Sequence, residues 1–366
     1  MMIVFASMMA LVLSLIHFII YKLIVTIFSF SVTWRIFIGI ILAILGISFI
    51  IASILTFYFN NSSTNFLYTI SASWIGFAVY LFLFSCLFFL VLHISQVFNL
   101  NISSQYFGIL CFLLAIIFGI YGIIHARQII VKDINVTMPN FPADWQEKKA
   151  VWISDLHLGA VYDKNFAQNI VTKINEINPD IVFIGGDLYD GTKTDETDII
   201  KPLTELHPAL GTYFITGHHE EFRNNKIYLD AIKNIGIHVL NNEMTTIDGV
   251  QLIGVDDKDS INITEFNIIL SSLNIDKSKP TILLKHQPSQ LAEAAKAGIS
   301  FQISGHTHQA QMFPLDIFTN LIYKGYDYGF RKVDEMDVFT SSGVGTWGPP
   351  MRVGSDSEIV VFNFLK

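Results

Sequence analysis

Acidic residues are absent from the first third of the sequence. Residues 1–127 contain no Asp or Glu, and their only Lys or Arg residues are Lys22, Arg35 and Arg127. All 31 acidic residues of the 366-residue chain therefore follow Arg127. A long stretch with so little charge is typical of membrane-spanning segments rather than of a soluble domain. Because the remainder is acidic, no nucleic acid is expected as a binding partner, since such surfaces are normally basic.

Cysteine is also scarce. The two cysteines, Cys86 and Cys111, lie in apolar stretches, and the remainder has none. This excludes a disulfide framework, a zinc–cysteine site and a thiol nucleophile there. The chain contains neither a Gly-rich Walker loop nor a Gly-x-Ser-x-Gly elbow. A triphosphate cradle of that kind and a serine hydrolase are therefore not supported.

Long apolar runs fill the acid-free region. They lie at about 3–21, 36–59, 68–93 and 106–125. Each is near or above the roughly 20 residues that a helix needs to cross a bilayer. We therefore expect residues 1–127 to form a multi-pass integral membrane region of about four helices, with three or five spans as alternatives. The basic residues that flank the runs favour opposite orientations. The sequence therefore leaves open on which side of the membrane residues 128–366 lie.

From residue 151 onward, strand-like and helix-like segments alternate. Strands are expected at 151–154, from 181, and at 212–215, 237–240, 281–284 and 300–303, with a hairpin at 245–247 and 250–253 and short strands within 337–364. Helices are expected at 163–178, 195–206, 224–235, 263–273 and 288–297. This pattern predicts an α/β domain with a mixed sheet at 151–366, preceded by a connector at 128–150.

Five of the expected strands end in Asp or His, mostly beside a Gly. These residues are Asp155 and His157, Asp187 with Asp190 after it, His218 and His219, His286, and His306 and His308. The carboxyl ends of such strands form the edge at which α/β proteins build their sites. Neutral imidazole and carboxylate together suit Zn, Fe, Mn or Co. The set exceeds the needs of one ion, and Asp187 is the natural carboxylate to bridge two ions.

These motifs, in this order, resemble those of the calcineurin-like metallophosphoesterases. They are Asp155-Leu-His157, Gly186-Asp187-Leu-Tyr-Asp190, Gly217-His218-His219-Glu220, His286 and Gly305-His306-Thr-His308, all within residues 150–310. The sequence around these motifs is similar to that of a membrane-anchored bacterial subgroup of the family. The similar segments are HQPSQLAEAAKAGISFQISGHTH and SSGVGTWGPPMRVGS. The resemblance implies a four-layer α-β-β-α sandwich and location in the bacterial cell (inner) membrane.

The resemblance also implies a dinuclear centre of two divalent metal ions: Mn, Fe, Zn or Co. It assigns Asp155, His157 and His308 to the first ion, His286 and His306 to the second, and Asp187 to both. His219 would contact the phosphoryl group of the substrate and protonate the leaving oxygen, and Asp190 would orient His219. A water or hydroxide that bridges the metals would be the nucleophile.

Two positions depart from the family pattern. His218 stands where the family normally has an Asn that ligates the second metal. Its imidazole either ligates a metal instead, or swings away and leaves a weaker second site, or marks a degenerate site. Gln309-Ala310 stands where the subgroup usually has Gly-Gly, which we expect to narrow the mouth of the site.

Other residues are expected near the rim of the site. Asp256 and Asp257 follow an expected strand, and Trp347 and Arg352 lie in GTWGPPMR. Two interpretations are open for each of these residues: a substrate contact or a structural residue.

We therefore expect a membrane-anchored dimetal phosphoesterase that cleaves a phosphate ester or pyrophosphate bond. Its partners would be the membrane and a phosphorylated substrate, with a lipid-linked substrate such as a nucleotide-sugar lipid as one option. The alternative is a catalytically weakened metal- or ligand-binding regulatory module, which only His218 supports. A transporter ranks last, because the spans contain no Asp or Glu.

Overall fold

The computed structural model describes residues 2–59, 61–138, 140–222 and 225–365. The chain divides into two compact units. The first comprises Met1–His125 with Gly348–Met351, and the second comprises Ala126–Trp347 with Arg352–Lys366.

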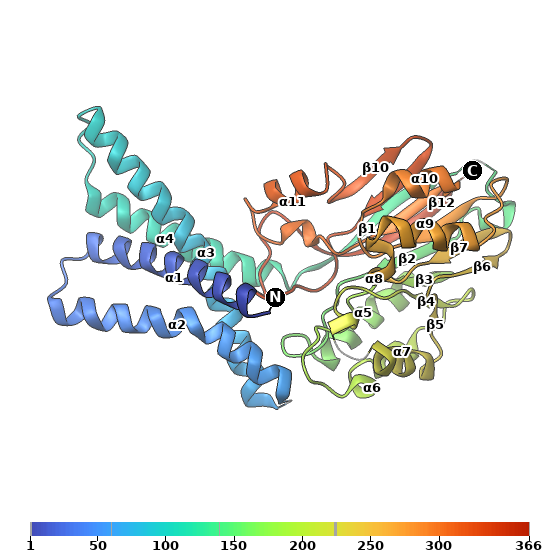
Figure 1. Cartoon of the computed structure of the whole chain (residues 1–366), viewed down its shortest axis with the longest axis horizontal. Helices are drawn as coiled ribbons and strands as arrows, with labels where there is room; N and C mark the ends of the chain where they lie inside the picture. Colours follow the sequence, from blue (N-terminus) through green and yellow to red (C-terminus); the bar gives the residue numbers. More distant parts are fainter. Residues whose placement is uncertain (1, 60, 139, 223–224, 366) are drawn as a thin grey trace. The chain divides into compact units, whose positions relative to one another are not determined.

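The first unit contains four helices, shown in blue to cyan in Figure 1: α1 (Met2–Ile27), α2 (Val32–Tyr58), α3 (Ser62–Val97) and α4 (Ser104–His125). All four are long and apolar enough to cross a membrane, which confirms the predicted multi-span region. The helices extend beyond the apolar runs. As a result, Lys22 lies inside α1 and Arg35 lies in the first turn of α2.

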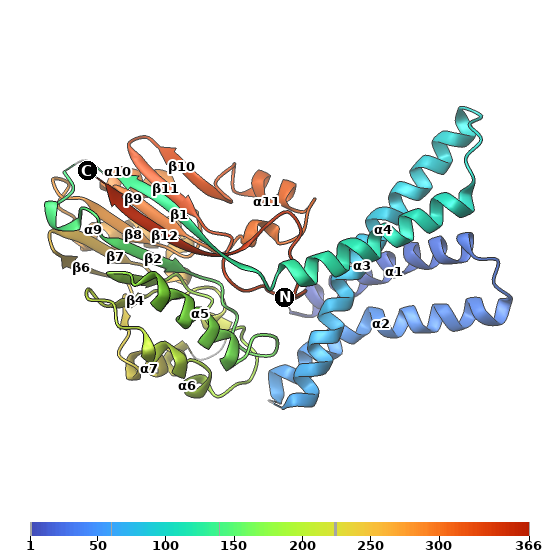
Figure 2. The ribbon, with the colours of Figure 1, turned by 180° about the vertical axis from the view of Figure 1, so that it is seen from behind.

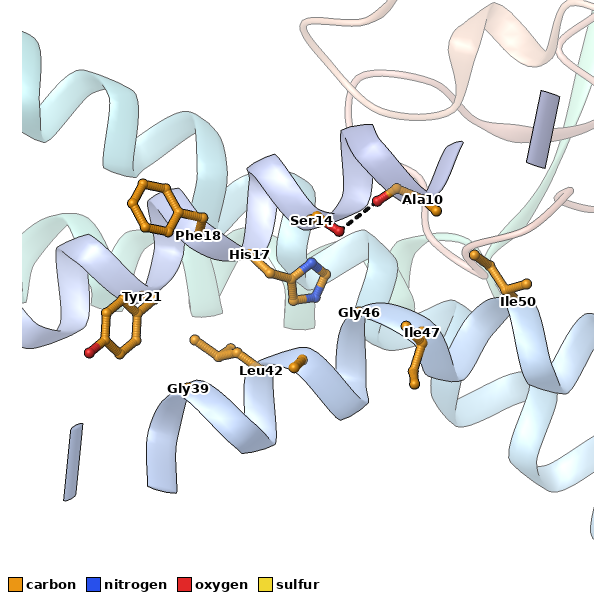
Figure 3. A pocket seen from close by; sticks show the side chains of 11 residues that line it. Ala10, Ser14, His17, Phe18, Tyr21, Gly39, Leu42, Gly46, Ile47 and Ile50 are labelled. Carbon is orange, nitrogen blue, oxygen red and sulfur yellow. Dashed lines mark hydrogen bonds between the residues drawn. The ribbon is translucent and has the colours of Figure 1, made fainter. Parts of the chain in front are cut away.

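A cavity of about 330 Å³ lies between α1 and α2 (Figure 3). His17 of α1 points into this region beside Gly46 of α2. The His17 Nδ1 atom lies 2.7 Å from the Leu13 carbonyl oxygen, and the Trp74 indole N–H donates to Nε2 at 2.9 Å. The buried imidazole is therefore hydrogen-bonded on both nitrogens, as a polar group among apolar helices must be.

The second unit contains two six-stranded sheets. The first has the order β1 (Ile129–Thr137), β12 (Ser357–Leu365), β2 (Lys149–Ile153), β3 (Ile181–Ile184), β4 (Thr212–Phe214) and β5 (His238–Val239). The second has the order β10 (Gly329–Val333), β11 (Met336–Thr340), β9 (Phe301–Ser304), β8 (Thr281–Leu284), β7 (Val250–Gly254) and β6 (Glu243–Ile247). β2 to β5 are mutually parallel, and so are β7, β8, β9 and β11.

Helices cover the outer face of each sheet, so the unit has four layers (Figures 1 and 2). The described helices of this unit are α5 (Lys164–Ile177), α6 (Glu196–Ile199), α7 (Asn225–Asn234), α8 (Asp257–Ile261), α9 (Ile263–Ser272), α10 (Leu291–Ala297) and α11 (Asp316–Ile322), of which α11 buries no residue. Side chains of α5 and α7 pack on the first sheet, and those of α9 and α10 pack on the second. A third buried cluster, which includes Trp152, Leu284 and Phe362, fills the space between the sheets. This confirms the α-β-β-α sandwich.

Three local features differ from the sequence expectation. The expected connector at 128–150 contains β1, which pairs with β12 along nine residues. β12 is itself nine residues long, because every residue from Ser357 to Phe362 is buried inside the sheet. The helix expected at 195–206 is divided into α6 and a 3₁₀ helix at Lys201–Glu205, since Pro202 cannot donate the hydrogen bond that an α-helix would require there.

Candidate metal centre

The predicted site residues come together at the carboxyl ends of strands from both sheets. Asp155 and His157 follow β2, Asp187 follows β3, His218 and His219 follow β4, His286 follows β8, and His306 and His308 follow β9. Three groups of these side chains hold their donor atoms within 4.8 Å of one another. The structure thus brings residues separated by up to about 150 positions into one cluster.

The first group is Asp155, His157 and His308. The Nε2 atoms of the two imidazoles face each other at 3.0 Å, and the His308 Nε2 atom lies 3.5 Å from Asp155 Oδ1. Asp155 and His157 are buried, and only about a tenth of the His308 side chain is exposed. Two ring nitrogens and one carboxylate oxygen therefore converge on a shielded point, a donor set that suits Zn, Fe, Mn or Co.

The second group is Asp187, His286 and His306. His286 Nε2 lies 3.2 Å from Asp187 Oδ2 and 3.2 Å from His306 Nδ1. The other nitrogen of His286, Nδ1, lies 2.7 Å from the carbonyl oxygen of Gly185. Because a carbonyl oxygen only accepts, Nδ1 carries the proton of the neutral ring and Nε2 presents its lone pair to the cluster.

Asp187 lies between these two groups, and it forms the third group together with His157 and His219. Its Oδ2 atom is 3.2 Å from His286 Nε2 and 3.9 Å from His157 Nε2, so the same oxygen faces a ligand candidate of each group. Its Oδ1 atom accepts the backbone N–H of His219 at 2.7 Å. That hydrogen bond fixes the carboxylate in the shared position.

The protonation states of three imidazoles fit a metal site. Burial lowers the pKa of His157 and His308 well below the usual histidine value, and it lowers that of His306 to about 3. These rings are therefore neutral near pH 7, which is the form that binds metal. The residues present thus fit divalent ions in donor type and burial. Burial alone would lower the pKa of His286, but the adjacent Asp187 carboxylate raises it well above the usual histidine value, so metal binding at His286 would release a proton.

The backbone at the site is unusual for residues with side chains. Positive φ angles of 50° to 69° occur at Asp155, His157, Asp187, His306 and His308. Such angles are sparsely populated outside glycine and persist where the surrounding structure imposes them. A Cβ atom on Gly217 would lie 2.3 Å from the Asp187 nitrogen. Glycine is therefore required there for the strand ends to approach.

His219 and Asp190 interact differently from the expectation. His219 Nδ1 lies 2.9 Å from the backbone carbonyl oxygen of Asp190, not from its carboxylate. The carboxylate instead accepts the Ala160 N–H at 2.7 Å and the Thr192 N–H at 2.6 Å. Asp190 therefore orients His219 through the main chain, and its side chain stabilises the loop that presents that carbonyl.

Glu220 contributes more than the sequence indicated. The sequence placed it in a motif but assigned it no role. Its buried carboxylate accepts the N–H groups of Gly217, Asp187 and Tyr189 at 2.7, 3.0 and 3.1 Å. These bonds tie the end of β3 to the end of β4. Only the folded geometry shows this function, because the three donors are backbone atoms.

His218 lies at the edge of the cluster. Its side chain is about half exposed, and among the described residues it belongs to none of the three donor groups. Its Nδ1 atom lies 3.9 Å from Asp257 Oδ2. Each donor group therefore contains three ligand candidates without His218.

The rim residues separate into exposed and structural ones. The Trp347 side chain is about half exposed, and its ring centroid lies 5.8 Å from that of His219. Arg352 is fully buried and donates to the carbonyl oxygens of Ser342 and Gly345 at 2.6 and 2.7 Å. Arg352 is therefore a structural residue, whereas Trp347 is exposed beside His219.

Comparisons with known proteins agree with this geometry. A profile of the calcineurin-like phosphoesterase family matches residues 148–310. An uncharacterized metallophosphoesterase of Aquifex aeolicus is 30% identical over 253 residues, which cover 68% of this chain and 96% of the relative. A Danio rerio protein named transmembrane protein with metallophosphoesterase domain is 29% identical over 352 residues, which cover 89% of this chain and 79% of the relative. A Helicobacter pylori metallophosphoesterase is 33% identical over 224 residues, 60% of each chain.

The fold, the donor groups and these matches define a metal-dependent hydrolase of phosphoric esters. The chain belongs to the calcineurin-like metallophosphoesterase family. The match to the Danio rerio protein extends over 89% of the chain, so it includes much of the apolar helical region. Because the relatives come from bacteria and from animals, the bacterial subgroup and the bacterial inner membrane stay predictions.

Proposed function

We propose that the second unit hydrolyses phosphate esters or pyrophosphates at a dinuclear metal centre. Asp155, His157 and His308 would hold one ion, and His286 and His306 the other. The single observation that carries this proposal is the position of Asp187, whose Oδ2 atom faces both donor groups. Two divalent ions so held would supply an activated water and stabilise the charge on the phosphoryl oxygens.

The remaining residues would act on the substrate or on the ligands. His219 lies beside the shared carboxylate, with its ring orientation fixed by the Asp190 carbonyl. In this position it would contact the phosphoryl group and donate a proton to the leaving oxygen, which is ordinary general-acid chemistry for histidine. Glu220 would hold Asp187 and Gly217 in register.

The test is hydrolysis of p-nitrophenyl phosphate and bis-p-nitrophenyl phosphate by the full-length protein in detergent. The protein is first stripped with a chelator and then supplied with Mn, Fe, Co or Zn. We expect no activity in the stripped protein and recovery with at least one metal. Undiminished hydrolysis after verified metal removal would contradict the proposal. Comparison of the two esters ranks monoester against diester preference.

We further propose that the substrate lies at a membrane surface and is lipid-linked. The support is the presence, in the same chain, of four helices apt to cross a membrane. Purified protein should then cleave a lipid-linked phosphodiester or pyrophosphate in mixed micelles more efficiently than a soluble ester. Efficient cleavage of soluble esters with no cleavage of the lipids would reject this part alone.

The regulatory-module alternative depended on His218. The convergence of three donor groups that do not include His218 supports the hydrolase over that alternative. The hydrolase is therefore the function that the geometry supports.

A further inference from the structure

A hollow of about 400 Å³ adjoins the metal centre. It is lined by His218, Glu221, Asp257, Lys258, Ile261 and Asn262. The His218 ring links the two regions, because its centroid lies 6.2 Å from that of His219 and 6.3 Å from that of His306. A ligand with its phosphoryl group at the metal centre would thus meet His218 first and then enter the hollow.

Asp257 lies next to His218, and hydrogen bonds hold it in place. Its side chain is buried, and both of its carboxylate oxygens lie 3.1 Å from Gln287 Nε2. Its backbone N–H donates to the Thr216 hydroxyl at 3.1 Å. A carboxylate anchored in this way, 3.9 Å from His218 Nδ1, limits the directions in which the half-exposed imidazole can point.

The lining of the hollow mixes donors with acceptors. Glu221 and Asp257 accept hydrogen bonds, Lys258 donates, and Asn262 can do both. A hydroxyl group also donates and accepts, so a hydroxylated group can satisfy this mixed lining. An ammonium group only donates, so it could pair with Glu221 and Asp257 but could not accept the hydrogen bonds that Lys258 offers. The volume lies within the range of small-molecule sites.

We propose that this hollow is the leaving-group subsite of the hydrolase and receives a hydroxylated alcohol such as a glycerol or sugar moiety. His218 contacts that moiety instead of a metal, and Asp257 is the positioning residue that orients His218. The proposal rests on the proposed function of the adjoining centre and names the substrate chemistry that the centre would process.

The experiment compares two monoesters, glycerol 2-phosphate and p-nitrophenyl phosphate, in the metal-loaded full-length protein. The variants are Asp257→Asn and His218→Gln, with Asp230→Asn as the matched control on an exposed face of α7. We expect both variants to raise KM for glycerol 2-phosphate about tenfold, the effect of losing one substrate-directed hydrogen-bonding group. KM for p-nitrophenyl phosphate should rise less, because its leaving group carries no hydroxyl for His218 to bind. The Asp230→Asn control should change less than twofold with both esters.

Metal content per chain provides a readout that is independent of activity. We expect His218→Gln and wild type to bind equal amounts of metal. Loss of metal in His218→Gln, with kcat lowered for both esters, would show that His218 is a ligand and overturn the proposal. Equal changes in KM for both esters, or none, would also overturn it while leaving the metal centre intact. If the wild type hydrolyses neither ester, the proposed function fails and the subsite fails with it.

Discussion

Among the histidine residues at this site, His219 has the proposed role of general acid. His219 presents its backbone N–H, not its ring, to Asp187 Oδ1, which leaves the imidazole available for proton transfer. We predict that His219→Ala lowers kcat by about 10²–10⁴-fold, the usual contribution of a general acid. Metal analysis of the same variant should give the wild-type content. A loss of metal would instead make His219 a ligand.

Glu220 offers a prediction about stability. Its removal would leave three buried N–H groups without their acceptor. Glu220→Ala should therefore lower the free energy of unfolding by about 3–5 kcal/mol, whereas Glu220→Gln retains one acceptor oxygen and should cost less. Thermal melts of the metal-free proteins give the comparison. Equal melting temperatures for wild type and Glu220→Ala would contradict this role.

Ala310 has a strained backbone at a position where the membrane-anchored subgroup usually has glycine. Its φ angle is 56°, and that of Gln309 is 49°. A left-handed conformation costs a residue with a Cβ about 1–2 kcal/mol. Glycine avoids this cost, but it loses more conformational entropy on folding, which cancels part of the gain. Ala310→Gly should therefore stabilise the protein by about 0.5–1 kcal/mol. The matched control, Ala292→Gly on the exposed face of α10, should destabilise it by about 1 kcal/mol.

The limits of sequence inference are clearest for Asp190 and His218. Motif spacing predicted that both lie near the centre, and the structure places them there. The sequence did not distinguish the Asp190 carbonyl from its carboxylate, because every residue carries a backbone carbonyl. The sequence also placed Asp257 near the rim of the site, but it did not pair Asp257 with His218, since the two are distant in sequence and approach each other only in the fold.

At the scale of elements, the loop between β11 and β12 depends on Arg352. The guanidinium donates to Ser342, Gly343 and Gly345 carbonyl oxygens, and also to that of His308 at 3.3 Å. Lysine has a single ammonium group and lacks the planar fork that serves several acceptors. We predict that Arg352→Lys lowers stability by about 3 kcal/mol and weakens metal binding through His308. Unchanged melting and metal affinity would exclude this role.

The sequence predicted which segments form strands better than it predicted how those strands pair in the sheets. The alternation of apolar runs with helical segments predicted β2, β3, β4, β8 and β9, whose ends carry the site. It did not predict β1, which has exposed and half-buried positions along one edge of the sheet. The long β12 was also missed as one strand, because its pairing with both β1 and β2 depends on distant chain segments.

At the scale of the whole molecule, β1 determines where the second unit can be separated. A fragment of residues 126–366 keeps β1 and all nine of its residue pairs with β12. A fragment of residues 151–366 loses β1 and begins inside β2. We predict that the longer fragment is soluble and melts cooperatively, whereas the shorter one exposes the edge of β12 and aggregates. Equal solubility and equal melting temperatures would contradict this account of the first sheet.

The most direct test of the central claim is metal stoichiometry in wild type and Asp187→Asn. Asp187 faces ligand candidates of both donor groups, so its replacement by a neutral amide should weaken both sites at once. We predict about two ions per wild-type chain, a large loss of metal in Asp187→Asn, and loss of phosphoesterase activity in parallel. One ion per wild-type chain, or full metal content and activity in Asp187→Asn, would contradict a centre built around a shared carboxylate.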